Sequence, residues 1–152
     1  MTDDKKPASD RLEIYKLLVE MADRVSQRRQ AANSFYLSIN TLLLGGSAYL
    51  GGTPRQTQGV LVITVAGIAI CSLWVWNILS YKTLNAAKFA VIQEVEKSLT
   101  IQPYTDEWAR LDPEQDGERH TPFHRVEMLV PWVFLTAYVV QGAIALYKMI
   151  CS

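Results

Sequence analysis

The sequence has long stretches without any charged residue, and these are the first guide to its class. No charged side chain lies between Arg29 and Arg55, and two further charge-free runs follow at 59–81 and 128–147. A helix that crosses a bilayer needs about 20 consecutive, mostly apolar residues, and the first run reaches that length with its flanks. The three runs therefore predict transmembrane helices over 34–50, 59–81 and 128–147.

The sequence also has no net charge and only two cysteines. Fifteen basic residues balance fifteen acidic ones, so the electrostatic attraction that nucleic acids require is missing and we expect no nucleic-acid partner. Cys71 and Cys151 are the two cysteines. Cys71 falls in a predicted span, where we expect a small apolar side chain. Cys151 is either a weakly held terminal residue or half of a disulfide between subunits, and the sequence leaves both open.

The predicted spans contain no Asp, Glu, Lys, Arg or His. Pumps and ion-coupled transporters keep such groups inside the membrane, so we expect neither activity, and no catalytic residue or cofactor. His120 and His124 are four residues apart, but Pro122 starts a helix between them, which favours a solvated helix start over a metal site. An enzyme would have only the region around these histidines and Glu107 to use.

Glycine and proline are missing between Pro7 and Gly45. After a disordered tail at 1–8, the sequence thus predicts one helix that runs through 9–33 and continues as the span 34–50. The span 59–81 likewise continues without a breaker to about Leu99. Pro103 then ends this helix, and Thr105 can cap a short helix that ends near Leu111.

Basic residues are unevenly distributed along the chain. Seven precede the first span, one lies between the first and second, six lie between the second and third, and only Lys148 follows. By the positive-inside rule the N terminus and the helical segment 82–127 are cytoplasmic, whereas the loop 51–58 and the tail 148–152 lie outside.

A row of residues at steps of seven runs along the first helix. It begins with Leu12 and Val19 in the water-exposed part, and turns small and polar in the membrane part. A surface that faces lipid would do the opposite, so we predict that this row faces protein, most simply other copies of the chain. The alternative is that the row lines a water-filled pore. The residues concerned are Ser26, Asn33, Asn40 and Ser47.

The segment before the first span has two apolar stripes at helical spacing. Two adjacent stripes suit a helix that packs between partners on both sides. The alternative is an amphipathic helix on the membrane surface, but acidic residues dilute the basic charge of its polar face. The stripes are Leu12, Tyr15, Val19, Ala22 and Ile14, Leu18, Met21, Val25.

Several blocks of the sequence together resemble the RipA family of octameric bacterial membrane proteins. The resemblance implies a homo-octamer in the bacterial cytoplasmic membrane, and it implies no catalytic residues. In such a membrane the loop 51–58 and the tail 148–152, which the positive-inside rule places outside, are periplasmic. The blocks are Tyr15-Lys16, Met21 to Arg29, Ala32-Asn33, Ile39-Asn40-Thr41, Tyr81-Lys82, Leu84-Asn85, Ala87-Lys88-Phe89, Ile92, Glu96, Leu99, Pro103-Tyr104-Thr105, Glu107-Trp108, Leu111 and Val130-Pro131-Trp132.

A more distant likeness is to SLATT domains, which are two-span effectors of nucleotide-signalling defence systems, although this chain adds a third predicted span. We therefore predict an all-α membrane protein with three transmembrane helices, the first two continuing as long cytoplasmic helices, assembled as a homo-oligomeric ring. Its expected partners are copies of itself and membrane lipid. The leading functional hypothesis is a non-enzymatic scaffold or regulatory assembly, and the alternative is a channel or pore-forming effector.

Overall fold

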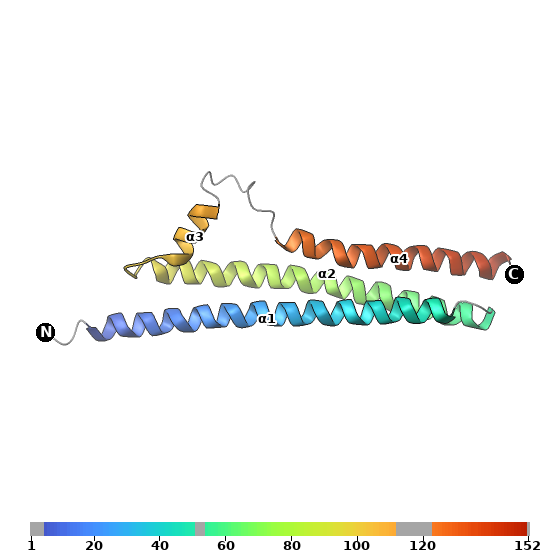
Figure 1. Cartoon of the computed structure of the whole chain (residues 1–152), viewed down its shortest axis with the longest axis horizontal. Helices are drawn as coiled ribbons and strands as arrows, with labels where there is room; N and C mark the ends of the chain where they lie inside the picture. Colours follow the sequence, from blue (N-terminus) through green and yellow to red (C-terminus); the bar gives the residue numbers. More distant parts are fainter. Residues whose placement is uncertain (1–4, 51–53, 112–122, 152) are drawn as a thin grey trace. The chain divides into compact units, whose positions relative to one another are not determined.

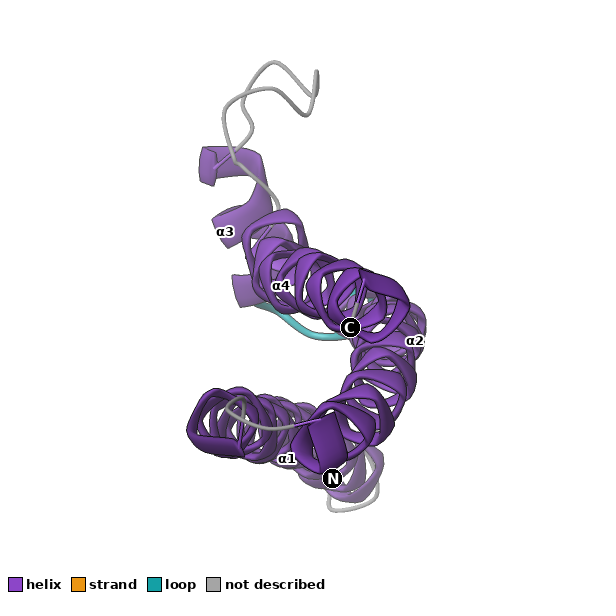
Figure 2. Ribbon diagram, turned by 90° about the vertical axis from the view of Figure 1, so that its right-hand side faces the viewer, coloured by secondary structure: helices purple, strands orange, loops and turns teal. Residues whose placement is uncertain are grey.

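The computed structural model describes residues 5–50, 54–111 and 123–151, and these residues confirm the all-α prediction. They form four helices and, within these ranges, no strand (Figures 1 and 2). The helices are α1 (Lys5–Leu50), α2 (Pro54–Glu96), α3 (Pro103–Leu111) and α4 (Phe123–Cys151).

Helix α1 has 46 residues without interruption, as expected from the lack of breakers before Gly45. At 1.5 Å per residue it is about 70 Å long, more than twice the thickness of a bilayer core. It begins at Lys5, earlier than the start at residue 9 that we predicted. Pro7 does not prevent this start, because the first turn of a helix needs no backbone donor there.

Helix α2 has 43 residues and begins at Pro54, a position where proline suits a helix start. It ends at Glu96 rather than near Leu99. The amides of Ser98 and Leu99 bond the carbonyls of Val95 and Glu96 at 3.0 and 2.9 Å, which tightens the chain into a turn. Residues 51–53 of the predicted loop lie outside the described part of the chain.

Helix α3 starts at Pro103, two residues before the predicted cap at Thr105. Helix α4 has 29 residues and extends beyond the predicted span 128–147 at both ends. It contains Pro131, which is buried. Of the two histidines considered as metal ligands, His120 lies outside the described residues and only the backbone of His124 belongs to them.

Two compact units divide the chain. The charged unit combines residues 1–29 with 80–122, and so holds the start of α1, the end of α2 and α3. The apolar unit combines residues 30–79 with 123–152. In the apolar unit α1, α2 and α4 lie side by side (Figures 1 and 2).

Two helices of the described ranges are long and apolar enough to cross a membrane, namely Thr57–Glu96 and Val126–Cys151. The apolar run of α1 is not among them, and it includes Asn40 and several serines. Both candidate spans keep an outward apolar surface: Val62 is 70% exposed and Val133 is 67% exposed. Such a surface suits lipid or another protein chain rather than water.

Candidate functional site

The inward face of α2 in the apolar unit is built from residues at alternating spacings of four and three. This spacing keeps side chains on one side of a helix and lets it pack lengthwise on a neighbour. One member, Gly67, has no side chain, and two, Thr64 and Cys71, carry polar atoms. The full set of buried positions is Val60, Thr64, Gly67, Cys71, Trp74 and Ile78.

The polar row of α1 faces this side of α2 and α4. Asn40 is fully buried and Ser47 is 4% exposed, whereas Ser26 and Asn33 are half-buried. Asn33 and Asn40 each bond side chains of both α2 and α4. Ser47 bonds a side chain of α4. Each of the three forms one tier of what we call the polar ladder. Its tiers are seven residues apart, or about 10 Å along the helix.

The first tier joins three helices through Asn33. The indole Nε1 of Trp74 in α2 donates to Asn33 Oδ1 at 2.9 Å. Asn33 Nδ2 in turn donates to Oε1 of Glu127, near the start of α4, at 3.2 Å. The Trp74 ring is held by stacking on Tyr36, with ring centroids 5.7 Å apart and an angle of 11°. The amide of Asn33 therefore uses both its donor and its acceptor between helices.

The second tier is the most enclosed. Asn40 Nδ2 donates to the carbonyl of Tyr36 at 2.8 Å, and Cys71 Sγ donates to Asn40 Oδ1 at 3.3 Å. From α4, the hydroxyl of Tyr138 donates to the backbone carbonyl of Asn40 at 3.2 Å. Asn40 and Tyr138 are both 0% exposed. An apolar surrounding makes each of these bonds costly to break.

The third tier lies nearest the ends of α1 and α4. Ser47 Oγ donates to Gln141 Oε1 at 2.9 Å, and Gln141 Nε2 donates to Thr64 Oγ1 at 3.1 Å. The hydroxyl of Thr64 in turn donates a hydrogen bond to the Val60 carbonyl at 2.8 Å. Two side-chain bonds thus connect α1 through α4 to α2.

This arrangement bears on one prediction. We expect the row of Ser26, Asn33, Asn40 and Ser47 to contact other copies or to line a pore, and that stays a prediction. Within one chain, Asn40 and Ser47 are 0 and 4% exposed. Their partners belong to the same chain, so their role is to hold its three helices together. The partner residues Cys71 and Tyr138 were missed, because the spacing of α1 marks a face without naming what lies on it.

Gly67 permits the close approach of α4. A Cβ atom at this position would overlap the ring of Tyr138, which packs directly on the glycine backbone. Small residues bring membrane helices close in this way, and the close packing stabilises them where lipid offers no hydrophobic gain. Nothing in the spacing of α2 indicates that an aromatic ring packs on Gly67.

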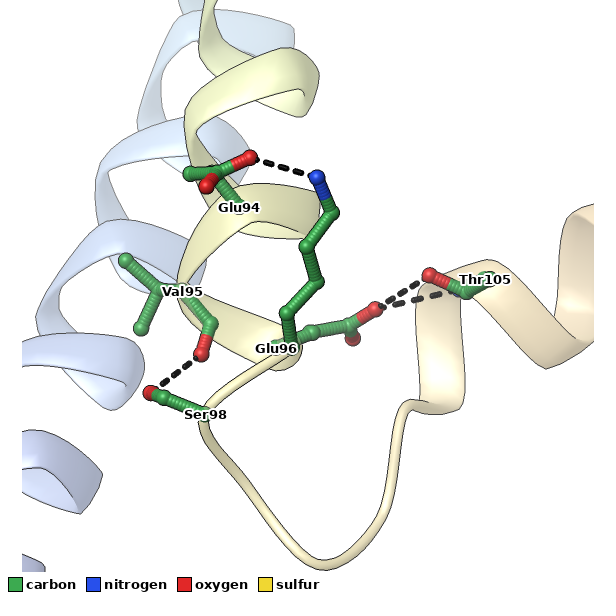
Figure 3. Close-up of polar contacts among 6 residues, drawn as sticks. Glu94, Val95, Glu96, Ser98 and Thr105 are labelled. Atoms are coloured by element: carbon green, nitrogen blue, oxygen red, sulfur yellow. Dashed lines mark hydrogen bonds and ion pairs between the residues drawn. The ribbon is translucent and has the colours of Figure 1, made fainter.

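The charged unit has its own centre at Glu96, whose side chain is fully buried. Its carboxylate accepts bonds from the amides of Tyr104 and Thr105 at 2.9 and 3.1 Å. The hydroxyl of Thr105 adds a bond of 2.9 Å (Figure 3). From α1, the hydroxyl of Tyr15 donates at 2.9 Å. Glu96, at the last residue of α2, thus caps α3 and anchors α1.

This result replaces our prediction that Thr105 caps α3, since the acceptor for the free amides comes from Glu96. Glu96 lies fifteen residues beyond the charge-free run 59–81, or about 22 Å along the axis. Burial raises the pKa of this carboxyl, but the bonds from Tyr104, Tyr15 and Thr105 outweigh burial, so the pKa falls below its ordinary value of 4.5. Burial and the bond to Glu96 raise the pKa of Tyr15.

In the charged unit, each of the two predicted stripes of α1 has some residues that are buried or half-buried and others that are exposed. Ala22 and Val25 are buried, and Tyr15, Leu18 and Val19 are half-buried. In contrast Leu12, Ile14 and Met21 are exposed by 45, 52 and 43%. One inward face therefore takes members of both stripes.

Comparison with known proteins gives one match. The sequence model of the octameric membrane protein family (8xMP) matches residues 12–147, which is most of the chain. No curated protein and no solved structure matches. The match agrees with the resemblance drawn from the sequence blocks, and it covers both units, including the polar ladder and Glu96. The chain is a member of the octameric membrane protein family (8xMP).

Proposed function

We propose that this protein is the subunit of a homo-octameric, non-enzymatic scaffold or regulatory assembly in the bacterial inner membrane. The observation that carries this proposal is the polar ladder, combined with the family description. Its amides, hydroxyl, thiol and indole bond one another between helices. Groups used in this way stabilise a rigid subunit, and they are then unavailable to a substrate.

The ladder also supports a third span in α1. Its tiers tie α1 to both candidate spans at Asn33, Asn40 and Ser47, over fourteen residues or about 21 Å. A segment bonded to two transmembrane helices over most of a bilayer core lies in the same bilayer. The distribution of basic residues then gives a cytoplasmic N terminus and a periplasmic C terminus.

The mass of the detergent-extracted complex tests the assembly. Native mass spectrometry of the full chain should give eight copies of the 17.1 kDa subunit. A monomer or dimer, retained across several mild detergents, would remove the proposal. Topology is checked by labelling single cysteines placed at each end of the chain in intact cells. Labelling of both ends from the same side would contradict the three-span arrangement, and labelling of the N-terminal cysteine alone from outside would reverse the proposed orientation.

Bilayer recordings separate the scaffold from a channel. Because the row that could have lined a pore bonds its own chain, we expect no conductance from reconstituted octamers at any voltage tested. A conductance that changes when Asn33 or Asn40 is substituted would favour the channel instead.

A further inference from the structure

The side of α1 that faces away from the ladder has a second regular row. Leu42 follows Asn40 by two residues, which at about 100° per residue places it on the opposite side of the helix. Phe35, Leu42 and Tyr49 repeat at steps of seven, and they are exposed by 61, 74 and 92%. We call these three large side chains and the small residues between them the outer row.

The small residues of the outer row are Ala31, Ser38 and Gly45, and all three are exposed. A Cβ atom at Gly45 would meet nothing within 4 Å. Ser38 hides its hydroxyl by donating to the Ser34 carbonyl at 2.8 Å. Large and small residues that alternate at spacings of three and four form the knobs and holes of a helix interface. A surface that only met lipid would need no such alternation.

A groove of about 670 Å³ lies between the three helices of the apolar unit. Small side chains line it, including Ala48 of α1 and Ala137 and Ala145 of α4. Ile144, on its wall, is 52% exposed, so the groove opens on the outside of the chain. The outer row lies on a different face of α1 from Ala48, because Leu42 and Ala48 are six residues, or about 120°, apart around the helix.

The outer row and the groove lie at the same depth along the helices. The ladder ties Asn40 to Tyr138 and Ser47 to Gln141, so the stretch of α4 that lines the groove is level with the stretch of α1 that carries Leu42 and Tyr49. Rotation about the membrane normal leaves depth unchanged. In a ring of identical chains these two side chains therefore come level with the groove of the neighbouring subunit.

We propose that the outer row of each subunit packs into the groove of the next, with Leu42 and Tyr49 as the inserted side chains. This inference rests on the proposed homo-octamer and names the surfaces that build it. Two different faces meet in such a contact, and this head-to-tail arrangement is the kind that closes into rings. The occupant of the groove is thus a second copy of the chain rather than a lipid acyl chain.

Disulfide crosslinking of the full chain tests the contact. The two native cysteines are first removed by Cys71→Ala and Cys151→Ser. The double variant Tyr49→Cys, Ile144→Cys is then made in this background, oxidised, and compared with each single variant. The matched control pair is Val62→Cys with Ile144→Cys, because Val62 is 70% exposed and does not line the groove. We expect a series of covalently linked chains up to the octamer from the first pair, at least fivefold more than from the control.

The mass of the same samples separates the two proposals. An octamer in which the Tyr49 pair links no better than the Val62 pair would overturn the contact and leave the octamer intact. A monomer would remove the octamer and the contact with it.

A second variant needs no cysteine background. Ala137→Trp fills the groove and should reduce the octamer at least tenfold, whereas Val139→Trp, outside the groove, should preserve it. If Ala137→Trp keeps the octamer and releases bound lipid, the occupant is an acyl chain and the inference is overturned.

Discussion

The two units join their helices through different kinds of hydrogen-bonding group. In the charged unit a single ionised carboxylate, Glu96, collects four hydrogen bonds from α1 and from the start of α3. In the apolar unit, amides, hydroxyls and an indole form most of the bonds along the ladder. In the proposed topology only the apolar unit lies in lipid, where an ionised group costs far more to bury than near water, and the type of bond in each unit fits that topology.

The two units also differ in how strongly each depends on a single residue. The charged unit depends on one centre, so one substitution should loosen α1 and α3 together. The ladder has three tiers over about 21 Å, so loss of one tier leaves the others in place. We therefore expect larger effects from single changes at Glu96 than from single changes in the ladder.

The largest effect is expected from Glu96→Ala. It leaves the amides of Tyr104 and Thr105 and the hydroxyl of Tyr15 without their acceptor, and should lower the free energy of unfolding of the charged unit by about 3 kcal/mol. Hydrogen exchange of residues 97–111 measures this loss. Glu94→Ala, which removes an exposed ion pair with Lys97, is the control and should cost at most about 0.5 kcal/mol. Equal effects of the two variants would contradict the central role of Glu96.

Gly67→Ala should have the next largest effect, and it acts on the apolar unit. The added methyl group overlaps the ring of Tyr138 and should cost about 2 kcal/mol through overpacking. Denaturant titration of the detergent-solubilised protein measures the change. Addition of Tyr138→Leu removes the ring, and the double variant should lose less stability than the sum of the two single variants. Additive losses would show that the ring and the glycine do not compete for the same space.

Asn40→Leu removes one tier of the ladder and should have a smaller effect. It removes the acceptor of the Cys71 thiol, but the backbone carbonyl that Tyr138 uses remains. We expect a loss of about 1 kcal/mol and faster alkylation of Cys71 by a small maleimide. Val62→Ala, on an exposed position of α2, should leave the alkylation rate unchanged. If Asn40→Leu leaves it unchanged as well, the second tier does not protect Cys71.

Lowering the pH should produce the smallest effect, and it should destabilise the charged unit more than the apolar unit. Because the folded pKa of Glu96 lies below 4.5, its contribution to stability is fully present above pH 4.5 and is lost as the pH falls through the folded value. A protonated carboxyl still accepts bonds at one oxygen, so the loss is less than in Glu96→Ala. Hydrogen exchange at 97–111 should rise below pH 4.5 relative to Glu96→Gln. A rise of the same size in Glu96→Gln would assign it to another group.

Much of the local structure was predictable from the sequence, because helix continuity depends on neighbours in the chain. The missing breakers predicted the long helices. Glycine was the weaker guide, because a break is expected from Gly45-Gly46 as well as from Gly51-Gly52 and Pro54, whereas α1 continues through Gly45 and Gly46 to Leu50. The row of Ser26, Asn33, Asn40 and Ser47 is predicted to face protein on a different ground, because its polarity conflicts with lipid.

The centre of the charged unit was not predictable in this way. Glu96 lies on a helix among other charged residues, and its spacing does not distinguish it from Glu94, which is exposed. Only the turn after α2 brings the start of α3 back to its carboxylate. The partners of the ladder were hidden for a similar reason, because Tyr138 is 98 residues from Asn40.

The sequence by itself determined which segments are helical, where they break and which side of α1 is polar, since each of these follows from residues within a few turns of one another. The tertiary structure decided what lies on that side. It placed α2 and α4 of the same chain against the polar row, and left the large and small residues of the outer row exposed. Periodicity defines a face of a helix, but only packing in three dimensions determines whether its partner is the same chain or the next.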